Sequence, residues 1–368
     1  MLVAVMMITL AIAGSSHPMR AEVLASAETL KASRALPAFS RPPKRLFISG
    51  HSLTDAPFPQ QLAAIAESLG HSLHWNVQNQ FGSTLKERVE NHRLGMDRDG
   101  APVDMARAVR QPQPYDTWLV TEQHTLLDNL VWNDTAAHLR SFHRRAVEAN
   151  PSAQTFLYQS WLGVMDRNDP GRWISYERAA SPVWACLAEG VNHSLADEGY
   201  PGRILPLPAG LALAELVDRA TTDGGLKPLS GANSQATMER LFRDDVHLTP
   251  AGSYYVALVS YAFLYRSPPL QAWFPPEMAP DTAAVLQQQA WGFTKRYLQN
   301  YRAPDPESCS RYVSETFVPI YLNYLRDLGL SQDGSLWTWV RWARFRAQWP
   351  RLFRQKGQAN PLLRAGES

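Results

Sequence analysis

Two segments far apart in the chain carry side chains that together could cleave an ester. The first, Gly50-His51-Ser52-Leu53, offers the hydroxyl of Ser52 as a nucleophile. The second, Asp244-Asp245-Val246-His247, places a carboxylate three positions before an imidazole. An imidazole can take the proton from an attacking serine and return it to the leaving group, while a carboxylate fixes the tautomer of the ring. Ser52, His247 and Asp244 are therefore the candidate nucleophile, base and orienting acid.

The secondary structure predicted around these residues places each candidate segment on a loop that leads into a helix. The apolar residues Leu46-Phe47-Ile48 within the segment 44–50 predict a short buried strand, and Gly50 gives freedom for a turn, so Ser52 falls on a strand-to-helix loop. Pro250 suits the first turn of a helix, which the apolar stretch 254–265 continues. Taken singly, each candidate residue is more typical of a turn, a cap or a structural histidine, and the joint arrangement is what favours catalysis.

The chain resembles the SGNH (GDSL-like) hydrolase superfamily over about residues 44–266. Gly50-His51-Ser52-Leu53 is similar to the first block of that family, with His51 where the usual pattern has Asp, and Asp244 to His247 is similar to the last block. The resemblance implies that Ser52, Asp244 and His247 form a catalytic triad. It also implies that the backbone N–H groups of Ser52 and Gly82 bind the oxyanion, Gly82 lying in the second-block segment 79–83.

The third block departs from the family pattern. Thr121-Glu122-Gln123-His124 stands where the family usually has Gly-x-Asn-Asp, whose Asn amide completes the oxyanion hole. Gln123 carries the same amide on a longer stem. Because one such donor is worth roughly 100-fold to 1000-fold in turnover, its placement decides between a competent and a slow enzyme. The candidate substrate contacts are His51, Glu122, His124 and Trp161, and the alternative for Glu122 and His124 is a plain loop surface.

The α/β-hydrolase fold also carries a serine on a strand-to-helix turn. Its elbow reads Gly-x-Ser-x-Gly because close packing needs small residues on both sides, whereas Thr54 occupies the second glycine position here. The candidate nucleophile also follows the first recognisable strand, and the acid lies only three residues before the base. We therefore set that fold aside.

Strands that alternate with helices predict a doubly wound α/β fold. The expected strands are 44–50, 74–77, 117–120, 154–158 and 202–207, and the expected helices between and after them are 59–69, 134–149, 182–198 and 254–265. Such alternation is typical of a parallel sheet, here five-stranded, that is covered on both faces and binds ligands at the carboxyl ends of its strands. The resemblance implies the flavodoxin-like, three-layer α/β/α arrangement of SGNH hydrolases.

Two polar segments are candidate walls of the cleft. The segment 161–178 follows the fourth strand and carries Trp161, Trp173 and Tyr176, which suit a sugar or another amphipathic acyl carrier, although a packed surface loop is equally expected. The segment 221–239 precedes the Asp-His loop and is a candidate lid.

The length predicts a main domain with an appendage. The expected division is a signal peptide at 1–27, a linker at 28–43, a hydrolase domain at 44–270 and a helical extension at 271–368. The apolar run 1–13 followed by Ala25-Ser26-Ala27 favours export to the periplasm or medium, and an uncleaved anchor or a wrongly assigned start are the alternatives.

Composition narrows the classes of function. Lys+Arg number 36 against 34 Asp+Glu, which argues against a dedicated nucleic-acid binder. Zinc-ligand spacings and Gly-rich phosphate loops are absent from the sequence, so we expect no metal and no cofactor. Cys186 and Cys309 are expected as two buried free thiols, with a disulfide as the alternative.

The tail has a different character. Helical spacing covers 283–301, 312–328 and 336–354, and the last of these mixes aromatic residues with arginines. Because its aromatic residues fall at several angles around the helix, we favour packing or contact with a protein partner over contact with an anionic membrane surface, and over stacking on nucleic acid.

These observations predict an exported serine esterase that removes an O-acetyl or another short acyl group from a carbohydrate, a substrate class that the resemblance implies. Two alternatives stay open: an acyltransferase to a glycan hydroxyl, and a non-catalytic glycan-binding or scaffolding protein of the same fold.

Overall fold

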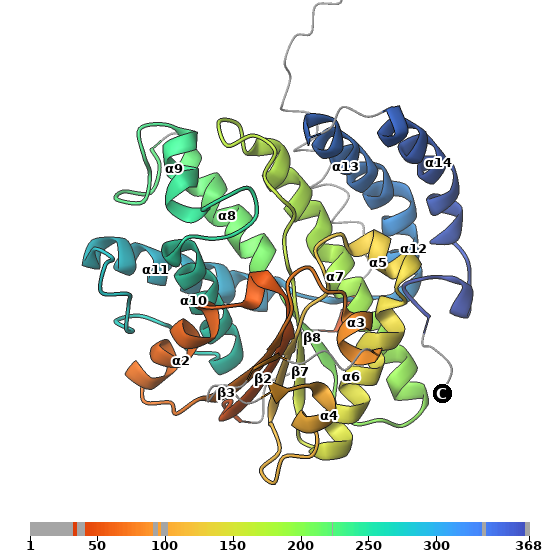
Figure 1. The fold of residues 1–368 in the computed structure, drawn as a ribbon, viewed down its shortest axis with the longest axis horizontal. Coiled ribbons are helices and arrows are strands. Elements are labelled where there is room, and N and C mark those ends of the chain that lie inside the picture. Colours follow the sequence, from red (N-terminus) through yellow and green to blue (C-terminus); the bar gives the residue numbers. More distant parts are fainter. Residues whose placement is uncertain are drawn as a thin grey trace, which may run out of the picture.

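The computed structural model describes residues 32–34, 41–90, 95–96, 102–222, 224–332 and 336–364. Its centre is a five-stranded sheet in the order β3-β2-β6-β7-β8, with every neighbouring pair parallel (Figure 1). The strands are β2 (Arg45–Gly50), β3 (His74–Asn79), β6 (Thr117–Val120), β7 (Gln154–Tyr158) and β8 (Ile204–Leu207). The parallel five-stranded α/β fold expected from the sequence is confirmed.

Helices cover both faces of this sheet and make the fold a three-layer α/β/α structure (Figure 1). One layer contains α2 (Phe58–Ser68), α8 (Ala209–Thr221) and α10 (Pro250–Tyr265), and the other contains α3 (Leu85–Glu90), α6 (Thr135–Ala149) and α7 (Gly171–Asp197). Because both faces are covered, three consecutive residues of the inner strand β2 are apolar and fully buried: Leu46, Phe47 and Ile48.

Helix α7 begins at Gly171, eleven residues before the predicted start at Pro182. Trp173 and Tyr176 therefore lie in its first turns and are buried, which corrects the expectation that they line a cleft from a loop. The sequence interpretation stopped at Pro182 because proline disfavours a helix interior. In the folded protein the helix continues through it, since burial of Trp173, Tyr176 and their neighbours stabilises the preceding turns.

The predicted lid 221–239 is not a single open loop. Its second half enters α9 (Ser234–Leu241), which Asn233 caps by accepting a hydrogen bond from the Ala236 N–H at 2.8 Å. Thr237, Met238 and Leu241 of this helix are buried. The helix thus packs into the domain and leads directly to the Asp-His loop.

The C-terminal extension packs against the main domain. It contains α11 (Pro280–Asn300), α12 (Pro306–Tyr312), a π-helical turn η2 (Val313–Phe317), α13 (Val318–Gln332), α14 (Leu336–Leu352) and the short η3 (Gly357–Ala359). Helix α11 lies against α10, whereas α12 and α13 lie along α7, with α14 on the far side of α13 (Figure 1). Tyr312 donates a hydrogen bond to the Ala179 carbonyl at 2.9 Å, and Tyr324 donates one to the Gly163 carbonyl at 2.7 Å.

Several short elements complete the described residues. The strand β1 (Ala32–Arg34), within the predicted linker, pairs antiparallel with β9 (Ala303–Pro304) of the extension. The strands β4 (Gly95–Met96) and β5 (Pro102–Val103) form a second small pair, followed by α4 (Met105–Ala108). The predicted signal peptide at 1–27 lies outside the described residues. Among the helices that the structure describes, none combines the length and the apolar character required to cross a membrane.

A disulfide joins Cys186 of α7 to Cys309 of α12, with a Cα–Cα distance of 5.5 Å. The expectation of two free thiols is therefore wrong. The reason is tertiary: α12 packs directly on α7, and this brings two residues that are 123 positions apart within the distance that a disulfide spans.

We predict that the double variant Cys186→Ser with Cys309→Ser unfolds more easily than the wild type. A crosslink between residues 123 positions apart restricts the unfolded chain, so its loss should lower the free energy of unfolding by about 2–4 kcal/mol. Urea unfolding followed by circular dichroism measures this change. Wild type in excess reductant should match the variant, and identical midpoints for the oxidised wild type and the variant would contradict the prediction.

Candidate active site

The loop that carries Ser52 is fixed by close packing directly after β2. Residues 52–54 form a short 3-10 turn, η1, in which the Leu53 N–H donates to Nδ1 of His51. A Cβ atom at Gly50 would lie 1.9 Å from Oγ1 of Thr54, so glycine is required there for close approach and not, as expected, for an unusual backbone angle. The Thr54 hydroxyl in turn donates to Oδ1 of Asn79 at 3.0 Å, which joins this turn to the end of β3.

His51 lies beneath the turn and not on the substrate side. It is 1% exposed, and its Nε2 donates to the Glu122 carbonyl at 3.0 Å while its Nδ1 accepts from Leu53. Burial, followed by the nearby positive charge of Arg88, lowers the pKa of His51 to about 3. A neutral His51 therefore joins the loops that follow β2 and β6, and the geometry does not support its predicted contact with substrate.

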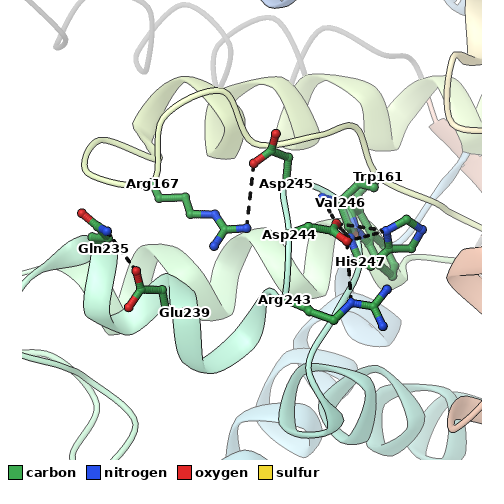
Figure 2. Close-up of polar contacts among 9 residues, drawn as sticks. All are labelled: Trp161, Arg167, Gln235, Glu239, Arg243, Asp244, Asp245, Val246 and His247. Carbon is green, nitrogen blue, oxygen red and sulfur yellow. Dashed lines mark hydrogen bonds and ion pairs between the residues drawn. The ribbon is translucent and has the colours of Figure 1, made fainter. Parts of the chain in front are cut away.

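The Asp-His pair forms as the sequence predicts. The His247 ring contacts Asp244 through Nδ1, which lies 3.0 Å from Oδ1 and 2.9 Å from Oδ2 of the carboxylate (Figure 2). The same carboxylate accepts hydrogen bonds from the backbone N–H groups of Val246 at 3.0 Å and His247 at 2.7 Å. This short loop therefore holds the ring so that Nε2 is the nitrogen left for substrate chemistry.

Asp244 is ionised over the whole physiological range. Partial desolvation raises the pKa of its carboxyl, but the hydrogen bonds from His247 and Val246 outweigh that effect and lower the pKa to about 2. Arg243 adds a positive charge 3.7 Å from Oδ2 (Figure 2). An ionised acceptor on Nδ1 is what a general-base imidazole needs to stabilise its protonated form.

Trp161 supports the Asp-His loop from behind. Its indole Nε1 donates to the Val246 carbonyl at 2.8 Å, and the ring is 1% exposed (Figure 2). Nearby, the Val164 N–H donates to the Asp245 carbonyl at 2.8 Å. The loop after β7 thus holds the base in place through two hydrogen bonds, and Trp161 is largely covered by the protein.

A cavity of about 140 Å³ is lined by residues of both candidate segments, the Ser52 turn and the Asp-His loop. It is lined by residues of the Ser52 turn and the start of α2, by the Asp-His loop and α10, and by Phe81 and Trp161; the residues are Ser52, Leu53, Asp55, Ala56, Pro57, Phe58, Phe81, Trp161, Arg243, His247, Leu248, Ser253 and Val256. Ser52 and His247 therefore share one cavity, although no hydrogen bond joins their side chains. Such bonds are often long in unliganded enzymes and tighten when substrate binds.

The second-block segment reaches this cavity through Phe81, which is 77% exposed at its rim. Gly82 follows with φ of +64°, a left-handed conformation that glycine adopts without strain. Its role as an oxyanion donor stays a prediction.

Gln123 is held by its side-chain oxygen. Oε1 accepts hydrogen bonds from the Thr125 N–H at 3.0 Å and the Asn129 amide at 2.8 Å. Because the oxygen end is occupied by donors, the NH₂ group is the end of the side chain available to an oxyanion. The longer stem of glutamine is thus anchored in one orientation, and its donation to the oxyanion stays a prediction.

A buried charged pair, which the sequence interpretation missed, lies under these loops. Arg88 is 1% exposed and donates to the Ser49 hydroxyl at 3.0 Å, to the carbonyl and hydroxyl of Ser83 at 2.8 Å, and to the Thr121 carbonyl. It therefore joins β2, the Gly82 segment and the end of β6. The available signal was its position in α3, where it shares the buried helix face with Leu85 and Val89.

Glu122 is the acidic residue whose negative charge acts on Arg88 in this buried cluster. It is fully buried and accepts hydrogen bonds from the backbone N–H groups of Leu85 at 2.9 Å and Gln123 at 2.7 Å, and from the Thr135 hydroxyl at 2.8 Å. Burial raises the pKa of Glu122, and the charge of Arg88 and these hydrogen bonds oppose that rise. Glu122 therefore positions the backbone of Gln123, and its side chain has no path to a substrate.

Of the predicted substrate contacts, Trp161 is among the residues that line the cavity, whereas His124 lies near His51 and His247 and is not one of them. The ring centre of His124 is 6.4 Å from that of His51, and burial, followed by the neighbouring His247, lowers its pKa to about 4. It is therefore a neutral imidazole close to the base, and its contact with substrate stays a prediction. Among the described residues, no group of three or more His, Cys, Asp or Glu side chains is arranged to hold a metal ion.

Comparisons with known proteins give no family assignment. No protein-family model and no curated protein matches the chain. Among solved structures, it is similar to a DUF4886 family protein from Bacteroides uniformis, with 15% identity, a TM-score of 0.46, and 71% of this chain and 97% of that chain covered. It is also similar to a carbohydrate esterase family 2 enzyme with a carbohydrate binding domain from Corynascus thermopiles, with 13% identity, a TM-score of 0.29, and coverage of 63% and 69%.

We predict that Asp244→Asn lowers kcat for an ester substrate by roughly 100-fold to 10,000-fold, because an amide neither stabilises the imidazolium nor fixes the same tautomer. The matched control is Asp245→Asn, which changes the adjacent carboxylate, 72% exposed and 3.8 Å from Arg167 (Figure 2). Steady-state kinetics measure kcat for both variants, and we expect a large loss only in Asp244→Asn. An equal loss in the two variants would show that charge near the loop, and not the contact with Nδ1, is what counts.

We predict that Glu122→Gln lowers kcat by about tenfold with little change in KM. The amide presents an N–H where a carboxylate oxygen accepts hydrogen bonds, so the backbone at Gln123 should shift. A lost buried hydrogen bond to a charged group also costs about 1.5–3 kcal/mol of stability. The control is Glu67→Gln, an exposed glutamate of α2. Unchanged kcat in a destabilised Glu122→Gln protein would reduce the pair to a purely structural role.

Proposed function

We propose that this protein is an SGNH-type serine esterase that acts outside the cytoplasm and removes a short acyl group, such as an O-acetyl group, from a carbohydrate. The observation that carries the proposal is the Asp244–His247 pair at 2.9 Å, presented to a cavity that Ser52 also lines. The order of these residues in the chain, and the resemblance of their segments to the first and last SGNH blocks, support the same assignment.

The geometry supports a two-step acyl transfer. In the first step Ser52 Oγ attacks the acyl carbonyl, its proton passes to His247 Nε2, and the alcohol leaves with that proton. In the second step a water attacks the acyl-serine with His247 again as the base, and the acid product leaves. The Gln123 amide and the backbone N–H groups of Ser52 and Gly82 are the donors for the negatively charged oxygen in both steps.

The size of the cavity favours a short acyl group. An acetyl group fits a space of about 140 Å³. The exposed ring of Phe81 at the rim offers an apolar face to the alcohol part of the substrate, as sugar-binding sites commonly do.

We predict that Ser52→Ala abolishes hydrolysis of p-nitrophenyl acetate, with a loss on the order of 1000-fold or more, because no nucleophile remains. The matched control is Ser253→Ala, which removes a buried hydroxyl from the same cavity. A fluorophosphonate probe should label the wild type and the Ser253→Ala variant but not Ser52→Ala. Labelling that depends on Ser253 would move the nucleophile, and no labelling of the wild type would favour a non-catalytic glycan-binding protein.

Two further measurements test the acyl length and distinguish hydrolysis from acyl transfer. Activity should fall as the acyl chain lengthens from acetyl to octanoyl. Product analysis with an acceptor glycan distinguishes hydrolysis from acyl transfer, since a transferase would place the acyl group on a sugar hydroxyl instead of releasing it as free acid.

A further inference from the structure

Helix α14 buries one of its faces against the rest of the extension. Trp349 is 2% exposed and its ring stacks on that of Phe345 at 4.7 Å, while Trp342 Nε1 donates to the Asn323 side chain of α13 at 3.0 Å. Phe353, just beyond the helix, is fully buried. One side of α14 therefore packs against the extension.

The opposite face of α14 carries an exposed apolar strip. It consists of Trp339, Val340, Ala343 and Ala347, and all four residues are exposed, Trp339 to 45% and Val340 to 56%. At 100° per residue these positions span about 100° of the helix circumference, so they form one continuous strip. The guanidinium of Arg326 lies 4.8 Å from the centre of the Trp339 ring, which holds that ring at the edge of the strip.

Arginines flank this strip on both sides. By the same helical spacing, Arg346 lies on one side, and Arg344 and Arg351 lie on the other; all three are exposed. The segment 336–354 contains five arginines and no Asp or Glu, in a chain whose total charge is only +2. Arg354 is paired with Glu315 at 3.1 Å, so the local positive charge is concentrated on the exposed face.

We propose that α14 is a docking site for an anionic phospholipid bilayer. An apolar strip with arginines on both sides matches a helix that lies in the plane of a membrane interface, with its apolar residues at the boundary of the acyl chains and its arginines on the phosphates. Tryptophan at the edge of the strip is suited to that depth. A soluble polyanion would pair with the arginines but would leave Trp339 and Val340 in water, which is why lipid is the occupant.

The position of α14 determines where the proposed docking surface lies relative to the candidate active site. Helix α14 packs on α13 at the outside of the molecule (Figure 1), and Tyr324 of α13 contacts Gly163 in the loop that supports His247. Helix α14 contributes none of the residues that line the 140 Å³ cavity, so the proposed docking surface is separate from Ser52, Phe81 and the other lining residues.

The test is co-sedimentation of the full-length protein with phosphatidylcholine vesicles prepared with and without phosphatidylglycerol. We expect binding to the anionic vesicles that is at least about tenfold tighter than to neutral ones and that weakens with added salt. Every protein compared carries the same amino terminus, so differences between variants report α14 and not the apolar run 1–13.

Two variant pairs make the result specific. Arg344→Glu with Arg351→Glu should weaken binding to anionic vesicles at least about tenfold, whereas the control Arg110→Glu with Lys295→Glu, which changes the total charge equally at exposed sites outside α14, should not. Val340→Glu should weaken binding, whereas Leu270→Glu, at another exposed apolar residue, should not. Thermal unfolding checks that each variant is folded.

Three results would overturn the proposal. The first is an absence of binding to anionic vesicles, and the second is equal loss of binding in the α14 variants and their controls. The third is a dependence on the arginines without any dependence on Val340, which would indicate a site for a soluble polyanion instead of a lipid surface.

Discussion

The proposed oxyanion site depends on the hydrogen bonds that the buried guanidinium of Arg88 donates. The guanidinium is buried between three segments that are distant in the chain, and it donates a hydrogen bond to each of them, at Ser49, Ser83 and Thr121. Breaking such a buried charged cluster by removing one partner usually costs several kcal/mol, because the other partner is left uncompensated. Glu122 lies in the same buried cluster and accepts a hydrogen bond from the backbone N–H of Gln123.

The base is held by a separate set of contacts. Trp161 and Val164 bind the backbone of the Asp-His loop, and Tyr324 of the extension binds Gly163 between them. The C-terminal helices therefore support the loop behind His247 in addition to covering the domain. The disulfide between α7 and α12 joins this part of the extension to the helical layer that contains α7.

Electrostatics divide the three histidines near the site into different roles. His51 and His124 are neutral because burial lowers their pKa values, and only His247 has a carboxylate on its ring. A second protonated imidazole near the base would oppose proton transfer from Ser52. The burial of the other two rings thus leaves a single imidazole for proton transfer, which suits the role proposed for His247.

The sequence by itself determined the alternation of strands and helices, the parallel sheet and the pairing of Asp244 with His247, because periodicity and a spacing of three residues act locally. Only the tertiary structure decided which loops meet at the sheet edge. It buried His51 and Glu122, extended α7 through Pro182, joined Cys186 to Cys309, and placed Arg88 under the loops. Each of these outcomes depends on contacts between residues far apart in the chain, where burial and long-range hydrogen bonds outweigh local preference, and no local pattern encodes them.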